Sequence, residues 1–285
     1  MPSRPTRRRV LKALGSTATA WSLGAEPSAK TYSFWVFGLL KPTELLVGGW
    51  KESRLHCQSA SGERILEARQ TLAVNSASVP VRIAGPAGAA IRFILQAPGV
   101  LRRMYYGTLE IRSEADILIP VVTMDLETAV NSIVGAELPL LTTGRDALAA
   151  QAVVARSFMA GTPTQRHNQA FFCDTTHCQF LRSPGCENSP AGCATATTKK
   201  IVLANEVAIF PARYSAACGG STEAGERDGY LYQSVQCLIR RERGARRRGH
   251  GWGLCQEGAM ELARRDYSWR AIVRAYFPNA TLRAL

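Results

Sequence analysis

The chain has 285 residues, of which 46% are hydrophobic and 20% are charged, and its net charge is +13. This composition is that of a globular protein with a core, and no uninterrupted apolar run reaches the roughly 20 residues of a membrane-spanning helix. The positive charge favours an anionic partner, but no basic stripe interleaved with aromatic residues indicates nucleic acid, which we therefore exclude as a partner.

The first residues have the pattern of an export signal. Three arginines, Arg7 to Arg9, precede a short, weakly apolar stretch that ends at Ala25. This order is typical of a twin-arginine signal. We predict that residues 1–30 form an export signal and linker, and that the mature protein works in the periplasm or cell envelope without a transmembrane anchor. A basic tail without a targeting role is the alternative.

Residues 31–122 have the pattern of antiparallel β-structure. Short β-favouring runs are separated by Gly, Pro, Ser and Asn. The runs are Phe34–Phe37, Leu45–Val47, Val79–Ile83, Ile91–Leu95 and Tyr106–Ile111. Pro80 has no amide hydrogen to donate, so we expect its strand to lie at an edge of the sheet.

The pattern changes to helix at Asp125, which is a favourable N-cap residue. One helix is predicted from there to about Leu138, where Pro139 ends it, and a second is predicted over 146–160.

After a loop rich in Cys and His, a hairpin is expected to turn at Asn205-Glu206, and two short helices are expected to close the chain. We therefore predict one α+β fold over 31–285, in which the mainly β part, 31–122, packs against a helical and hairpin part, 123–285.

Eight cysteines are present, and seven of them lie in the C-terminal half of the chain. In the oxidising compartment that an export signal implies, this number predicts disulfide bonds, although the sequence does not give their connectivity.

Glu137 is the most informative position in the predicted helices. The apolar stripe of the first helix, which includes Val130, Ile133 and Val134, continues to Glu137 at helical spacing. A carboxyl group there would lose hydration, which raises its pKa and suits it to act as a general acid. The alternative is a helix-end glutamate that turns out to solvent.

His250 lies in the sequence Gly-His-Gly-Trp-Gly, where the flanking glycines allow positive φ and a close approach to a ligand. A turn histidine with a structural hydrogen bond is the alternative. Cys255 could act as a nucleophile beside His250, but disulfide pairing competes with this role.

Four potential metal ligands, His167, Cys173, His177 and Cys178, lie within twelve residues of one another. Two thiolates and two imidazoles suit tetrahedral zinc, and four protein ligands would make such a site structural. A folded chain exported by the twin-arginine route could acquire this metal in the cytoplasm. Disulfides at Cys173 and Cys178, with the histidines uninvolved, are the alternative.

The chain resembles the SpoIID/LytB family, named for the stage II sporulation protein D and an amidase enhancer. The resemblance runs from about Tyr32 to Phe277, and it is carried by several short segments that occur in the same order as in the family. These are Tyr106–Ile111, Ile133–Pro139, Ala147–Arg156, Cys173–Gln179, Tyr214–Glu223, Tyr230-Leu231 and Gly249–Ala259.

The resemblance implies lytic transglycosylase activity on peptidoglycan glycan strands, with a preference for strands stripped of stem peptides. It identifies Glu137 as the catalytic glutamate and implies no cofactor for catalysis, while some members hold zinc in a segment like His167–Cys178. The residues expected to line the groove are Gln151, Arg156, Ser215, Gly220, Thr222, Glu223, His250 and Gln256. A structural ion pair is the alternative role of Arg156.

Two departures from the family pattern favour other functions. Ala149 stands where the family often has lysine, and the stretch before Gly249 is short and rich in arginine, from Arg240 to Arg248. A non-catalytic module that binds glycan and enhances a wall amidase is therefore the main alternative. A hydrolase that uses Cys255 and His250 is a second one.

Overall fold

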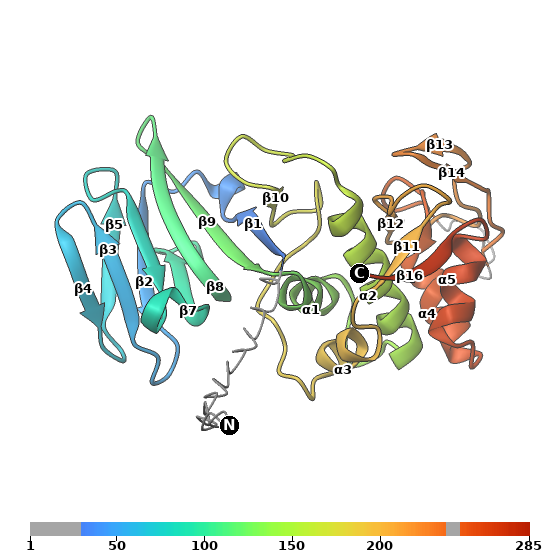
Figure 1. Cartoon of the computed structure of the whole chain (residues 1–285), viewed down its shortest axis with the longest axis horizontal. Coiled ribbons are helices and arrows are strands. Elements are labelled where there is room, and N and C mark those ends of the chain that lie inside the picture. Colours follow the sequence, from blue (N-terminus) through green and yellow to red (C-terminus); the bar gives the residue numbers. More distant parts are fainter. Residues whose placement is uncertain (1–29, 238–245) are drawn as a thin grey trace, which may run out of the picture.

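The computed structural model describes residues 30–237 and 246–285. The predicted export signal therefore lies outside the described residues apart from Lys30, as does the arginine-rich stretch up to residue 245. Figure 1 shows an elongated molecule with a large β-sheet at one end and the helices at the other. The predicted α+β class is confirmed.

The large sheet contains ten strands and two short 3-10 helices in its connections. Its strands are β1 (Thr31–Trp35), β2 (Glu44–Gly49), β3 (Leu55–Ser59), β4 (Gly62–Leu66), β5 (Thr71–Asn75), β6 (Val81–Ala84), β7 (Ile91–Ala97), β8 (Leu101–Glu114), β9 (Ile117–Asp125) and β10 (Phe172–Cys173). The 3-10 helices are η1 (Gly38–Leu40) and η2 (Pro86–Gly88).

The main path of the sheet is β10-β1-β9-β8-β6-β3-β4. A second branch leaves β8 in the order β7-β2-β5. All pairs are antiparallel except β1 with β10. Alternate residues of β8, among them Tyr105, Leu109 and Ile111, are buried in the core. This alternation is the pattern from which the strand was predicted.

The edge position predicted for the strand after Pro80 is wrong. Strand β6 lies between β3 and β8 and pairs with both. Pro80 precedes the first residue of the strand, Val81, so the ladder does not need the amide hydrogen that proline lacks.

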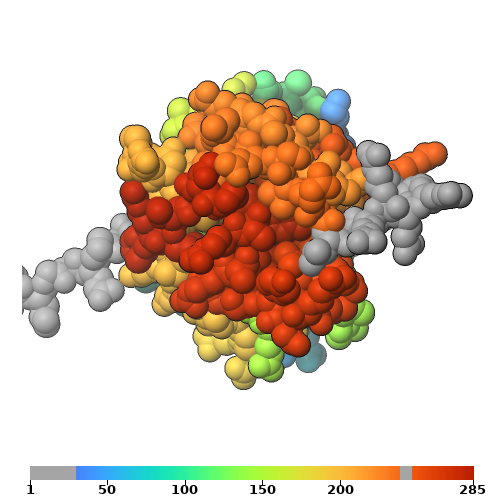
Figure 2. Space-filling view, turned by 90° about the vertical axis from the view of Figure 1, so that its right-hand side faces the viewer, coloured from blue at the N-terminus to red at the C-terminus, as the bar shows by residue number. Residues whose placement is uncertain are grey.

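Five helices and several short strands form the other end of the described chain. The helices are α1 (Leu126–Glu137), α2 (Arg145–Gly161), α3 (Pro190–Thr197), α4 (Gln256–Arg264) and α5 (Trp269–Tyr276). The strands are β11 (Ile201–Ala204), β12 (Tyr214–Ser215), β13 (Gly225–Arg227), β14 (Tyr230–Tyr232), β15 (Leu254–Cys255) and β16 (Thr281–Ala284). In Figure 2 the elements of the C-terminal part, coloured orange and red, cover most of this end of the molecule.

The first two helices begin and end close to their predicted bounds. Asp125 caps α1 by accepting a hydrogen bond from the backbone N–H of Thr128 at 3.0 Å. Helix α2 is buried from Ala147 to Met159, because α1, α3, α4, α5 and β11 all pack against it. Its many alanines allow these close approaches. The two closing helices, α4 and α5, were also predicted.

The predicted hairpin at Asn205-Glu206 is partly wrong. The chain does turn there, since the Asn205 side chain accepts hydrogen bonds from the N–H groups of Val207 and Ala208. Only an isolated bridge, Ala204 with Ile209, follows the turn. Strand β11 pairs instead with β16 at the end of the chain, so its partner is far away in sequence.

None of the helices in the described residues is both long and apolar enough to cross a bilayer. All eight cysteines are among the described residues, and no disulfide joins any two of them, so the predicted disulfides are absent from this structure. Five of the thiols belong to two clusters described below.

Candidate active site and metal-binding clusters

Glu137 ends helix α1, and its carboxylate is held by groups from two distant segments. The apolar stripe before it, at Val130, Ile133 and Val134, is fully buried, whereas Glu137 itself is half-buried. The backbone N–H of Phe180 donates to its Oε1 at 2.7 Å, and the hydroxyl of Tyr214 donates to the same oxygen at 2.9 Å. The carboxylate is thus fixed in place.

Burial raises the pKa of Glu137 above its ordinary value, as the helix pattern predicted. The Phe180 N–H, the Tyr214 hydroxyl and the nearby amide of Gln256 oppose this rise, because each stabilises the charged form. A raised folded-state pKa means that the folded chain binds this proton more tightly than the unfolded chain. The contribution of this group to stability is therefore lost as pH rises through the folded-state pKa.

Tyr214 reaches Glu137 because β12 pairs in parallel with β15. In this ladder Tyr214 lies opposite Leu254 and Ser215 lies opposite Cys255. The next residue, Gln256, begins α4 beside Glu137. Burial, followed by the charge of Glu137, raises the pKa of Tyr214 well above its ordinary value, so its hydroxyl remains a hydrogen-bond donor.

Glu137 lies in the wall of a cavity of about 350 Å³. The lining residues are Glu137, Phe158, Thr176, His177, Cys178, Arg213, Tyr214, Ser215, Ala216, Arg248, Gly249, His250 and Gln256. Glu137 is the one carboxylate among these described lining residues. The cavity therefore joins one acid with two arginines and two histidines.

Four of the residues predicted as catalytic or groove-lining line this cavity together, namely Glu137, Ser215, His250 and Gln256. The glycines beside His250 have positive φ, +91° at Gly249 and +79° at Gly251, as the sequence predicted. The N–H of Trp252 donates to Nδ1 of His250 at 3.0 Å. A neutral His250 therefore carries its hydrogen on Nε2, which can donate to a ligand.

Partial desolvation and the charges of Arg213 and Arg227 lower the pKa of His250. The ring is thus biased toward its neutral form.

The other predicted groove residues do not line this cavity. Gln151 is fully buried in α2. Thr222 is buried and accepts a hydrogen bond from the N–H of Val235, while Gly220 accepts one from the N–H of Cys237. Glu223 forms an ion pair with Arg247. These four residues therefore lie outside the cavity wall that contains Glu137.

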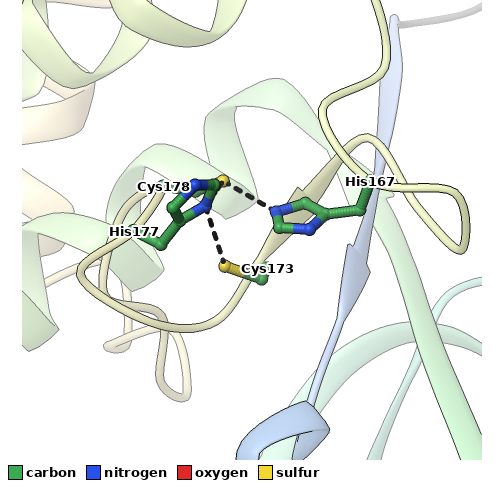
Figure 3. Close-up of side chains that lie close together, drawn as sticks. All are labelled: His167, Cys173, His177 and Cys178. Atoms are coloured by element: carbon green, nitrogen blue, oxygen red, sulfur yellow. Dashed lines mark hydrogen bonds between the residues drawn. The ribbon is translucent and has the colours of Figure 1, made fainter.

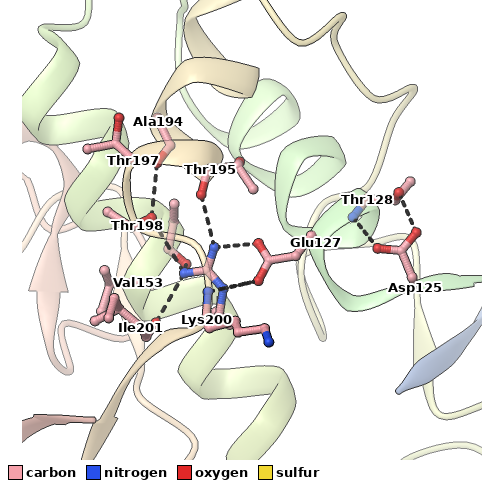
Figure 4. Close-up of polar contacts among 12 residues, drawn as sticks. Asp125, Glu127, Thr128, Val153, Ala194, Thr195, Thr197, Thr198, Lys200 and Ile201 are labelled. Atoms are coloured by element: carbon pink, nitrogen blue, oxygen red, sulfur yellow. Dashed lines mark hydrogen bonds and ion pairs between the residues drawn. The ribbon is translucent and has the colours of Figure 1, made fainter. Parts of the chain in front are cut away.

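Arg156 is also not in the cavity, because its side chain is 0% exposed and pairs with Glu127. Both oxygens of Glu127 accept hydrogen bonds from the guanidinium, at 2.9 and 2.7 Å. The remaining N–H groups reach backbone oxygens that include those of Thr195 and Ile201. Figure 4 shows these contacts around Glu127. The alternative of a structural ion pair is therefore the correct one for Arg156.

The predicted metal ligands form a compact cluster in the loop after α2 (Figure 3). One donor atom from each of His167, Cys173, His177 and Cys178 lies within 4.8 Å of all the others. Nε2 of His167 lies 3.2 Å from Sγ of Cys178, and Nδ1 of His177 lies 3.6 Å from the same sulfur. Two sulfur and two nitrogen donors at this spacing can hold a metal ion.

The metal cluster and the carboxylate share one loop. His177 and Cys178 line the cavity, and Phe180, two residues further along, donates its N–H to Glu137. Whatever fixes the 173–180 loop therefore also fixes one of the two hydrogen bonds that hold the carboxylate.

Sequence reasoning missed Arg213, Arg248 and Phe158 in the cavity wall and the contacts of Tyr214 and Phe180 with Glu137. Tyr214 belongs to a segment noted for its family resemblance, but its position beside Glu137 follows from a strand pairing distant in sequence. The contact of Phe180 uses a backbone N–H, which carries no residue-type signal.

A larger cavity, of about 1070 Å³, lies against the sheet, where strands β3, β4, β6, β8 and β9 contribute to its wall. None of the predicted site residues lines it. Its carboxylates, Glu63 and Glu110, contact Gln58 and Arg82 respectively. It therefore offers no counterpart to the enclosed carboxylate of Glu137.

The alternative of a Cys255 nucleophile is not supported by this geometry. Cys255 is 1% exposed and is absent from the cavity wall that His250 lines. Hydrogen bonding with Cys237 and burial raise its pKa, which disfavours the nucleophilic thiolate.

Comparison with known families identifies a segment that carries part of this site. Residues 115–205 match the family model described as SpoIID, Stage II sporulation protein. The chain contains a SpoIID family domain. The matched residues of the SpoIID domain include Glu137 and the whole His/Cys cluster, whereas Tyr214, His250 and Gln256 lie beyond it. No curated protein matches the chain significantly.

Proposed function

We propose that this protein is an exported lytic transglycosylase that cleaves peptidoglycan glycan strands and leaves 1,6-anhydromuramoyl ends. The observation that carries the proposal is a single carboxylate, Glu137, with a raised pKa, in the wall of a cavity that has no second carboxylate among its described lining residues. The SpoIID domain supports a cell-wall context.

A single carboxylate is sufficient for this reaction. Hydrolytic glycosidases use two, because one protonates the leaving group and the other activates water or attacks the sugar. In a lytic reaction the C6 hydroxyl of the muramoyl ring replaces water. Attack within one sugar gains from proximity, which lowers the need for a second catalytic group.

Glu137 would act first as an acid and then as a base. The Phe180 N–H and the Tyr214 hydroxyl both donate to Oε1, which leaves Oε2 as the oxygen that carries the acidic proton. This proton passes to the glycosidic oxygen as the bond from C1 of the muramoyl ring to that oxygen breaks. The carboxylate then takes the proton of the C6 hydroxyl while the oxygen of that hydroxyl bonds to C1. This step restores the protonated form of Glu137.

The charge of the cavity wall supports a preference for stripped strands. Arg213 and Arg248 both line the cavity, and each also forms an ion pair, with Asp228 and Glu257 respectively. When the stem peptide is removed, each muramoyl unit carries a free lactyl carboxylate, which guanidinium groups bind well. An amide-linked stem peptide has no charge at that position.

The His/Cys cluster fits structural zinc. Its two sulfur and two nitrogen donors are those of tetrahedral zinc sites, and four protein ligands leave no position for substrate. In this role His167, Cys173, His177 and Cys178 would hold the loop that ends at Phe180, and cleavage would require no cofactor.

The first prediction concerns this cluster. We expect Cys178→Ser to reduce the zinc content by one ion per chain and to lower glycan cleavage by roughly 10- to 100-fold, as for the loss of groups that support a site. The measurements are elemental analysis and the rate of product release. Cys186→Ser, which changes an exposed cysteine outside both clusters, should leave both unchanged. Full zinc content in Cys178→Ser would refute the ligand assignment.

A second prediction concerns Tyr214. Its hydroxyl stabilises ionised Glu137, so Tyr214→Phe should raise the pKa of Glu137 further. The acid must be protonated to act, and its activity is lost as pH rises through this pKa. The descending limb of the pH–rate profile should therefore move to higher pH in Tyr214→Phe, while kcat falls roughly tenfold. Tyr267→Phe, at an exposed tyrosine, is the control. A limb that moves to lower pH would contradict this role.

The proposed activity is tested with purified glycan strands from which stem peptides have been removed. Mass spectrometry should detect 1,6-anhydromuramoyl ends, which no hydrolase produces. Reducing muramoyl ends would indicate hydrolysis, and binding without products would favour the alternative module that enhances a wall amidase. One observation bears on that alternative: Ala149, where the family often has lysine, is buried in α2 and absent from the cavity wall.

A further inference from the structure

A second cluster of donor atoms lies behind the cavity wall, and its residues come from three separate segments. Cys218 follows β12, Cys237 follows β14, and Cys255 ends β15. Their sulfur atoms all lie within 4.8 Å of one another, and all three residues are buried. None of them belongs to the His/Cys cluster, which is carried by the loop after α2.

Two N–H groups and the start of helix α4 would stabilise Cys255 as a thiolate once a bound cation displaces its proton. Its Sγ accepts hydrogen bonds from the N–H groups of Cys218, at 3.3 Å, and Gly258, at 3.4 Å. It also caps the N-terminus of α4, where the helix dipole favours negative charge. The guanidinium of Arg247 lies close by, since its Nε donates to the carbonyl oxygen of Cys218 at 3.3 Å.

Gly258 shows that the space around the sulfurs is closely filled. A Cβ at this position would collide with Sγ of Cys237 and with the hydroxyl of Tyr276. That hydroxyl lies 3.4 Å from Sγ of Cys237, so it is an oxygen donor at the edge of the cluster. The absence of a side chain at Gly258 is therefore what allows Cys237 to reach the other two sulfurs.

We infer that Cys218, Cys237 and Cys255 bind one thiophilic d10 cation, Zn²⁺ or Cu⁺, through three thiolates. Both ions prefer sulfur ligands. A disulfide would join two of the sulfurs and leave the third buried beside it, whereas one cation uses all three. The two N–H groups that donate to Sγ of Cys255 offset part of the negative charge that remains after three thiolates bind the cation.

This second metal would be structural and would act on the cavity through short connections. Cys255 is directly opposite Ser215 in the β12–β15 ladder and precedes Gln256. Ser215 and Gln256 both line the cavity. The cation would thus tie together the strands and the helix that form one side of the site. This inference does not depend on the proposed cleavage, because its readouts are metal binding and thiol state.

The test begins with the wild-type full chain, purified without chelator. Elemental analysis should find two thiophilic ions per chain, one for each cluster, and it distinguishes zinc from copper. After exchange with cadmium alone, ¹¹³Cd NMR should show two resonances. The one at lower field belongs to the site with three sulfur ligands, because sulfur deshields cadmium more than nitrogen does.

Variants then assign the lower-field resonance. Cys218→Ser should remove it and leave the resonance of the His/Cys cluster, and Cys237→Ser should do the same if the first variant does not fold. Cys57→Ser, at a buried cysteine outside both clusters, should keep both resonances. The inference is overturned if wild-type chain saturated with cadmium lacks the lower-field resonance. It is also overturned if intact mass and peptide mapping of unreduced protein show a disulfide between two of the three cysteines.

Discussion

Glu137→Gln is expected to reduce the release of 1,6-anhydromuramoyl ends by about 10²- to 10⁴-fold, the range typical of a lost general acid–base group. Glutamine keeps the shape of the side chain, and its amide oxygen can still accept from Phe180 N–H and the Tyr214 hydroxyl at the position of Oε1. It cannot donate a proton to the leaving oxygen or take one from the C6 hydroxyl. The loss should therefore lie in kcat, with little change in glycan binding.

The matched control is Glu261→Gln, because Glu261 is on α4 and forms ion pairs with Arg264 and Arg265 outside the cavity. Both variants should retain the circular dichroism spectrum of the wild type. Product release from Glu137→Gln at the rate of the control would remove Glu137 from catalysis. In that case the amidase-enhancer alternative would have to be tested by adding a wall amidase.

The parts of this site that could be predicted from sequence depend on local patterns. Asp125 as N-cap, the stripe through Val134 and the stop at Pro139 define α1, so the position of Glu137 on its buried side follows from helical periodicity. The four ligands of the His/Cys cluster lie within one short loop, so their proximity is also a local property.

The remaining parts depend on pairings between distant segments. Tyr214 and Gln256 meet Glu137 only because β12 pairs with β15, two strands of two residues each that have no detectable alternation. The same pairing brings Cys218 near Cys255. The hairpin prediction was partly wrong for a related reason, since β11 pairs with β16 at the end of the chain and local turn chemistry does not reveal so distant a partner.

Arg156 was predicted to line the substrate groove, but its side chain is fully buried away from the cavity. An arginine near a catalytic glutamate is a reasonable ligand for substrate, yet this guanidinium faces Glu127, at the opposite end of α1 from Glu137. Its function in the site is therefore indirect. It links α1 and α2 to the carbonyl oxygens of Thr195 in α3 and Ile201 in β11.

The free energy of unfolding is expected to fall by roughly 3–5 kcal/mol in Arg156→Met, the typical cost of removing one partner of a buried ion pair. Methionine retains much of the apolar volume, so the loss reports the missing guanidinium more than a cavity. Glu127, whose side chain is 25% exposed, would keep the N–H of Lys200 as a donor at 3.1 Å, which favours the lower end of this range. Denaturant unfolding measures the change.

Two further variants separate the ion pair from general damage to α2. Arg145→Ala changes an exposed arginine at the start of the same helix, and its effect should stay within about 0.5 kcal/mol. Adding Glu127→Gln to Arg156→Met should recover part of the lost stability, because the unpaired carboxylate is then replaced by a neutral amide. If Arg156→Met instead unfolds at the wild-type denaturant concentration, Glu127 and Arg156 contribute no net stability, and the anchoring of α1 must come from its apolar stripe alone.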